Sequence, residues 1–209
     1  MLTFLKNLSI LKLIAVFLAF SIVACDDSEP SFKNRTKNAE NTTQETTTQE
    51  NTTQEVATSK VEGQIITSDD GVSQVTVPDN WKVLSDLNDE AIIEVGNTRE
   101  ENYLILLSDP KTDLDYDYTL EEHAELTRGF LEEGVSVNYL SPPKNILING
   151  NFALQYEIKG VISGLDIVYL HTTVETDDYF HQMIAWTLES NYSRNESILQ
   201  SAINSFQEN

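Results

Sequence analysis

Glycine is scarce in this sequence, with 8 glycines among 209 residues. Nucleotide sites of the common kinds need several glycines at fixed spacings, because only glycine lets the backbone approach a phosphate closely. The sequence contains no phosphate-cradling loop, no dinucleotide fingerprint and no G-x-S-x-G nucleophile turn. We therefore expect no cofactor, and we expect the chain not to be an enzyme.

Basic side chains are also few, at 13 Lys and Arg against 34 Asp and Glu, for a formal net charge of −21. Such a surface repels phosphate backbones and anionic lipid headgroups, so nucleic acid is excluded as a partner. An acidic surface keeps a protein soluble, and it also suits a basic partner or cations. Composition alone does not separate these interpretations.

No apolar run is long enough for a conventional membrane span, which takes about 18 to 20 residues. Near the N-terminus, Lys6 and Lys12 precede a short apolar run over Leu13–Phe20, as in a targeting segment. The residues that follow, Ile22–Cys25, resemble the lipobox of bacterial lipoprotein precursors. The resemblance implies that residues 1–24 are a signal peptide.

Cys25 is the only cysteine. The lipobox implies a diacylglyceryl thioether on its sulfur and a third acyl chain, such as palmitate, on its amine, which together anchor a protein without a helix. The alternative is a secretory signal cleaved after Ala24 that leaves an exposed thiol, a liability in an oxidising compartment. A lipidated Cys25 leaves no thiol for a disulfide, a nucleophile or a zinc site.

The lipid anchor places the protein in the cell envelope, facing the periplasm or the cell exterior. Asp26 resembles the inner-membrane retention signal of enteric bacteria and favours the inner membrane. Residues 25–61 lack apolar periodicity, and the unit NTTQE occurs three times over 41–55. A segment this polar cannot offset its ordering entropy by burial, so we expect a disordered tether with an end-to-end distance of about 35 Å.

Residues 62–209 have the length of one domain. Alternating or apolar runs predict several strands, and short links through Asn149-Gly150-Asn151 and Thr176-Asp177-Asp178 predict hairpins. The runs lie at 73–77, 91–96, 103–108, 145–149, 152–159, 165–174 and 179–188. In the run 179–188 both faces are largely apolar, which requires cover on both sides. The sequence predicts an α+β fold, a mainly antiparallel sheet with helices packed on its faces.

Two helices are predicted to provide this cover. The first runs over 120–133, with a capping box formed by Thr119 and Glu122 and a stop at Gly134. The second runs over 194–206, with a capping box formed by Ser193 and Glu196. Its apolar stripe consists of Ile198, Leu199, Ala202, Ile203 and Phe206.

The order of these elements resembles the PsbP-like and DcrB-like group, which includes photosystem II extrinsic subunits and many small bacterial lipoproteins. The segments that carry the resemblance are VTVPDNW at 75–81, PPKNILINGNFALQYEI at 142–158 and the final SFQ, with Pro78, Trp81, Gly150, Ala153 and Tyr156 among their residues. The resemblance implies an α/β/α sandwich. It also implies a role in assembly or binding, and it transfers no catalytic residue.

Asp113, Asp115 and Asp117 stand at the spacing of the first ligands of a calcium loop. Tyr118 occupies the position that needs glycine, and Ala124 the position of the closing glutamate. These aspartates are candidate ligands for weak calcium binding. The alternative is a solvated acidic loop that stabilises the positive end of the following helix.

His123, His171 and His181 are the only histidines, and the predicted hairpin makes His171 and His181 candidates to face each other. Packed histidines are the alternative, because a metal needs three or four converging ligands. The aromatic residues either line a groove for a peptide or glycan or belong to the core. They are Trp81, Trp186, Tyr103, Tyr156, Tyr169 and Tyr179.

Three functions follow from these observations. The first is a lipid-anchored envelope accessory protein that binds a protein partner or supports assembly or stress tolerance, without catalysis. The second is a periplasmic immunity lipoprotein whose acidic domain neutralises a basic toxin. The third is a hydrolase that depends on His171 or His181.

Overall fold

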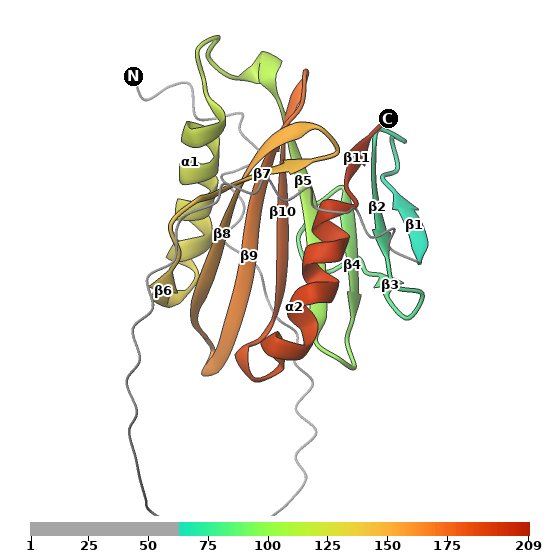
Figure 1. Cartoon of the computed structure of the whole chain (residues 1–209), viewed down its shortest axis with the longest axis vertical. Coiled ribbons are helices and arrows are strands. Elements are labelled where there is room, and N and C mark those ends of the chain that lie inside the picture. Colours follow the sequence, from blue (N-terminus) through green and yellow to red (C-terminus); the bar gives the residue numbers. More distant parts are fainter. Residues whose placement is uncertain (1–62) are drawn as a thin grey trace, which may run out of the picture. The chain divides into compact units, whose positions relative to one another are not determined.

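The structure, a computed structural model, describes residues 63–209, so the predicted signal peptide, Cys25 and the predicted tether lie outside the described residues. Within this range the chain forms eleven strands and two α-helices (Figure 1). In chain order the elements are β1 (Gln64–Thr67), β2 (Ser73–Val77), β3 (Lys82–Val83), β4 (Ile93–Asn97), β5 (Asn102–Pro110), α1 (Leu120–Glu133), β6 (Ser136–Leu140), β7 (Lys144–Ile148), β8 (Asn151–Ile162), β9 (Leu165–Glu175), β10 (Tyr179–Leu188), α2 (Glu189–Asn204) and β11 (Gln207–Glu208).

Eight strands form one sheet in the order β3-β4-β5-β10-β9-β8-β6, and β7 also pairs with β8. A second sheet has three strands in the order β1-β2-β11. Every pairing in both sheets is antiparallel. The predicted antiparallel sheet is therefore confirmed.

The larger sheet is buried on both faces because its central strands are apolar at successive positions. On β5, Ile105 and Leu107 point into one core cluster, while Leu104 and Leu106 point into the other. Helix α1 packs on the first face, and α2 packs on the opposite face (Figure 1). The predicted helices on both faces are confirmed, and the fold is α+β.

Helix α1 has the predicted limits. Thr119 Oγ1 accepts a hydrogen bond from Glu122 N at 3.2 Å, and the Glu122 carboxylate accepts from Thr119 N at 3.0 Å. This capping box satisfies backbone donors that the first turn leaves free. The helix ends at Gly134, which occupies the C-terminal cap.

Helix α2 begins earlier than predicted, at Glu189, directly after β10. The predicted capping box of Ser193 and Glu196 is wrong, because both residues lie inside the helix, and Leu188 is the N-terminal cap. The first turns were missed because none of the residues from Glu189 to Arg194 is buried, and the first buried residue of the helix, Asn195, is polar. Its Nδ2 donates to Thr187 Oγ1 at 3.0 Å, so the side chain is buried without an apolar signal.

Two predicted hairpins are present. The turn between β7 and β8 consists of Asn149 and Gly150, with φ of 49° and 89°, the left-handed conformations of a type I′ turn. The turn between β9 and β10 contains Thr176, whose Oγ1 accepts a hydrogen bond from Tyr179 N at 3.2 Å.

Four strands have no signal in the sequence pattern. Strands β3 and β11 have two residues each, which is too short for a period to appear, and β1 has four. All five side chains of β6 are exposed, so it lacks the alternation that marks a half-buried strand. It forms only because β8 offers it a backbone partner.

Five of the six candidate aromatic residues belong to the core. Trp81 and Trp186 are each 1% exposed, and Tyr103 stacks on Trp186 with ring centroids 5.2 Å apart. Tyr156 and Tyr169 are buried as well. The hypothesis that these five side chains line a recognition groove is wrong, because they are buried, whereas Tyr179 is only partly buried.

Candidate functional site

The three histidines are fully buried and lie on different faces of the larger sheet. His171 on β9 contacts α1, where its Nε2 is 3.2 Å from Thr127 Oγ1. His181 on β10 packs against the ring of Phe206, at a centroid distance of 4.7 Å, in the cluster that α2 covers. The hypothesis that His171 and His181 face each other is wrong, because they point away from opposite sides of the sheet, and they cannot share one active site.

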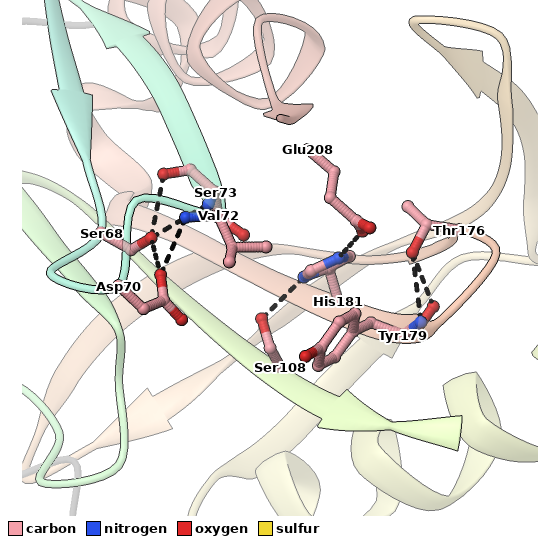
Figure 2. A network of polar contacts seen from close by, with 9 residues as sticks. All are labelled: Ser68, Asp70, Val72, Ser73, Ser108, Thr176, Tyr179, His181 and Glu208. Carbon is pink, nitrogen blue, oxygen red and sulfur yellow. Dashed lines mark hydrogen bonds and ion pairs between the residues drawn. The ribbon is translucent and has the colours of Figure 1, made fainter. Parts of the chain in front are cut away.

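His181 is the centre of a polar network on the α2 face (Figure 2). Its Nδ1 is 2.6 Å from Ser108 Oγ on β5, and its Nε2 is 2.7 Å from Glu208 Oε2 on β11. Burial lowers the pKa of His181, while the hydrogen bond and the charge of Glu208 act in the opposite direction. A neutral ring with this geometry donates from Nε2 to the carboxylate and accepts the Ser108 hydrogen at Nδ1.

The contact between His181 and Glu208 connects the two sheets. Glu208 belongs to β11, which pairs with β2 in the small sheet. The neighbouring turn of that sheet is held by Asp70, whose Oδ1 accepts hydrogen bonds from Ser68 Oγ at 2.6 Å and Val72 N at 3.0 Å (Figure 2). These two bonds lower the pKa of the Asp70 carboxyl. The network therefore fastens the C-terminal strand to the eight-stranded sheet.

Ser108, His181 and Glu208 also have the order of a nucleophile, a base and an acid. A serine nucleophile of that kind is normally presented on a strained turn that exposes its hydroxyl. Ser108 instead lies within β5, directly opposite His181 in the register with β10. The geometry supports a structural fastening rather than acyl transfer.

A second polar cluster lies beneath α1. Asp109 Oδ2 is 3.1 Å from His123 Nε2, and Gln182 Nε2 donates to the same oxygen at 3.5 Å. Thr127 Oγ1 donates to the His123 carbonyl at 2.8 Å, which leaves its oxygen to accept from His171 Nε2. These side chains are 0 to 5% exposed, so the cluster has no open access.

Burial lowers the pKa of His171 to about 3, and the charges of His123 and Arg128 lower it further. His171 is therefore neutral throughout the physiological range. A neutral imidazole that is fully buried and hydrogen-bonded is a packing element, in keeping with the alternative that the sequence left open.

The candidate calcium ligands lie in the segment between β5 and α1. Asp113 ends a short 3-10 helix (Lys111–Asp113), and Asp115 and Asp117 follow it, all three exposed. Among residues 63–209, no group of three or more His, Cys, Asp or Glu side chains is placed so that it could hold a metal ion.

The most distinctive surface lies at the β6–β7 edge of the larger sheet. Strands β6 and β7 pair one after the other with the same side of β8, so together they form one long edge. Large apolar side chains are exposed along it. We call this set the edge surface: Val137 (38% exposed), Tyr139 (47%), Leu140 (39%), Leu147 (64%) and Phe152 (70%).

The segment that carries the edge surface contains no acidic residue. No Asp or Glu occurs from Gly134 to Tyr156, the longest such run within residues 63–209 of a chain that has 34 acidic residues. Lys144 is the only basic residue in this run. This run is the signal that the sequence offers, and hydrophobic periodicity does not reveal it, because the run is marked by the absence of acidic residues and not by a period.

Phe152 illustrates how the edge surface arises. The sequence places it on one face with Leu154, Tyr156 and Ile158, and those three residues are buried in the cluster that α1 covers. Phe152 is 70% exposed, so α1 covers β8 from Leu154 onward and leaves the first residues of the strand uncovered.

None of the described helices combines the length and apolarity needed to cross a bilayer. The proposed lipid attachment at Cys25 lies outside the described residues.

Comparison with known proteins places the fold. No family model and no curated protein matches the chain. Among solved structures, cyanobacterial PsbP (CyanoP) from Synechocystis is 11% identical and superposes with a TM-score of 0.52, over 70% of this chain and 92% of that one. The chain therefore has the PsbP-like fold, and this likeness shows the fold alone.

Two further structures are similar. A Bacteroides thetaiotaomicron protein is 8% identical with a TM-score of 0.51, over 71% of this chain, and the match spans 49% of that protein, about half its length. LpqN of Mycobacterium tuberculosis, described as involved in cell envelope biogenesis, is 16% identical with a TM-score of 0.48, over 68% of this chain and 85% of that one.

Proposed function

We propose that this protein is a non-catalytic accessory of the bacterial cell envelope, anchored by lipid at Cys25, that binds a protein partner through the edge surface. The observation that carries the proposal is the exposure of Leu147 and Phe152, at 64% and 70%, in a segment without acidic residues. Apolar side chains gathered on the surface of a soluble domain are typical of an interaction site.

The energetics favour this use of the surface. Burying apolar area is worth about 25 cal/mol per Å², so covering Leu147 and Phe152 contributes a substantial part of a binding energy. Charged side chains are depleted at the centre of protein interfaces because burying them is costly. A segment that lacks Asp and Glu avoids this penalty, whereas the rest of the acidic surface does not.

The proposed anchor and tether limit how far the domain can move from the membrane. A lipidated Cys25 followed by a polar tether of residues 25–61 would let the domain search a layer of about 35 Å above the membrane. Confinement to that layer raises the effective concentration of an envelope partner. The Cys25→Ala variant should lose membrane association in cell fractionation, and retention in the membrane fraction would contradict lipid anchoring.

Chemical cross-linking in intact cells tests the partner. The full chain should capture a reproducible envelope protein, and the double variant Leu147→Lys, Phe152→Lys should capture much less of it. Val83→Lys is the matched control, because Val83 is 65% exposed on β3, at the opposite edge of the sheet. Equal loss in the control, or capture that the double variant leaves unchanged, would contradict the proposal.

An immunity lipoprotein is the second candidate, and the net charge of −21 favours it because a basic toxin would be attracted. Deleting the gene distinguishes the two functions. Loss of an accessory protein weakens an otherwise isolated culture, whereas loss of an immunity protein harms cells only when the toxin is present.

A further inference from the structure

We infer that the edge surface takes up its partner by strand addition: an extended segment with alternating apolar and basic residues pairs with β7 and continues the sheet. This inference rests on the proposed function, and it specifies the chemistry of the partner and its mode of binding.

The available edge is continuous. Strand β7 pairs with β8 from Lys144 to Ile148, and β6 pairs with it farther along, from Ser136 to Leu140. Between them, Ser141 N donates to Glu157 O at 2.9 Å, which keeps the chain against β8. In the described part of the chain, β6 and β7 have a strand partner on one side only.

Within this edge, β7 is the suitable docking strand. Strand β6 has a register shift between Val137 and Tyr139, and such irregularities disfavour further pairing. Pro142 and Pro143 follow β6 and have no N–H to donate. Strand β7 pairs with β8 in an unbroken register over all five of its residues.

Alternation along β7 decides which backbone groups face outward. Ile148 and Asn151 close the two-residue turn, and such a closing pair exchanges hydrogen bonds. Hydrogen-bonded and non-hydrogen-bonded pairs then alternate, so the N–H and C=O groups of Leu147 and Asn145 point away from β8. These are the groups that an incoming strand would meet.

Side chains next to these groups supply apolar contacts. Leu147 is directly opposite Phe152, and both lie on the α1 face, where side chains of an added strand would pack beside Leu147. Ile146 lies on the other face and is partly buried against the α2-side cluster. An incoming strand therefore meets apolar side chains at successive positions.

Charge complementarity defines the rest of the partner. The net charge of −21 attracts a basic segment. A lysine-bearing strand would gain this attraction without bringing a carboxylate into the contact. An acidic segment would be repelled by the same field.

The test uses the full chain in detergent and a synthetic peptide in which valine alternates with lysine. Amide hydrogen exchange should slow by about tenfold at Asn145 and Leu147 when the peptide is added, because their N–H groups become hydrogen-bonded. A peptide with glutamate in place of lysine should not protect them. A valine–lysine peptide with N-methylated valines should bind far less, because it lacks backbone donors.

A backbone variant separates strand addition from side-chain contact. Asn145→Pro removes an outward N–H at a position where an edge strand tolerates proline, and it should abolish the protection, whereas Asn145→Ala should keep it. Thermal unfolding would report whether each variant is folded.

The outcomes distinguish the two proposals. If Asn145→Pro is folded and still binds the peptide, or if the N-methylated or glutamate peptide binds equally well, strand addition by a basic segment is wrong. Absence of protection by the valine–lysine peptide would also contradict it. The proposed function would stand in these cases if the cross-linked partner still depends on Leu147 and Phe152.

Discussion

Leu147 and Phe152 lie directly opposite each other across the hairpin of β7 and β8, and both are more than half exposed, at 64% and 70%. Cross-strand apolar pairs normally stabilise a sheet by packing against a covered face. This pair lies beyond the region that α1 covers, so its apolar surface is available to a partner. The proposed binding of a partner depends on this exposed pair.

Replacing the pair should leave the domain stable. Leu147→Lys and Phe152→Lys each change an exposed side chain, so the free energy of unfolding should change by about 0.5 kcal/mol or less. Urea unfolding monitored by the fluorescence of the buried Trp81 and Trp186 measures this. A loss of several kcal/mol would mean that the pair is part of the core and not a surface for binding.

Gly160 supports the edge from the neighbouring strand. A Cβ at this position would lie 2.3 Å from Val135 Cγ1 and 2.8 Å from Ser136 O, so Gly160→Ala must push β6 away from β8. We expect a loss of about 1 to 3 kcal/mol in urea unfolding.

Gly129 provides the matched control for this substitution. A Cβ there meets nothing within 4 Å, and the residue lies inside α1. Gly129→Ala should therefore stabilise the domain by about 0.5 to 1 kcal/mol through helix propensity. Equal stability of the two variants would contradict the close packing of β6 on β8.

His171 should make the domain less stable in acid. Its pKa is about 3 when folded, against an ordinary value of 6.5, so the unfolded chain binds the proton more readily. Its contribution to stability is complete above pH 6.5 and is lost as the pH falls from 6.5 toward about 3, at up to ~1.4 kcal/mol per pH unit.

Comparison with His171→Leu isolates the contribution of His171 to the pH dependence of stability, because the carboxylates and the other histidines are unchanged. The free energy of unfolding should fall less steeply with decreasing pH in the variant, whatever its stability at pH 7. Parallel pH profiles would show that His171 takes up its proton at the same pH in the folded and the unfolded protein. The cluster beneath α1 would then be hydrated and not buried.

The fastening between His181 and Glu208 predicts a change in titration. The carboxylate of Glu208 raises the pKa of His181 against the effect of burial, so Glu208→Gln should move the midpoint to a lower pH. The imidazole resonances in an NMR titration measure the midpoint. Amide exchange in β11 should become faster at the same time, since its contact with the larger sheet is weakened. An unchanged midpoint would contradict the 2.7 Å contact.

Much of the fold was predictable because its core strands and α1 follow simple periods. The cap of α1 at Thr119 carries a signal that depends on neighbouring residues alone. The start of α2 was mispredicted because its residues from Glu189 to Arg194 are not buried, and the first buried residue, Asn195, is polar. Two-residue strands such as β11 form only through tertiary pairing.

The sites were less predictable for a similar reason. Whether His171 and His181 share a face depends on the register of β9 and β10, and a shift of one residue reverses it. The edge surface depends on where α1 ends its cover, which Leu154 and Phe152 alone do not reveal. The acid-free run was visible in the sequence, although only the exposure of Leu147 gave it a meaning.

The most direct test places a photo-cross-linking amino acid at position 147 of the full, membrane-anchored chain in intact cells, and at position 83 as the control. We predict that irradiation links a distinct envelope protein to position 147 and not to position 83, since both positions are similarly exposed but only the first lies on the edge surface. Cross-links of equal yield at both positions, or none at position 147, would contradict a partner bound at the β6–β7 edge.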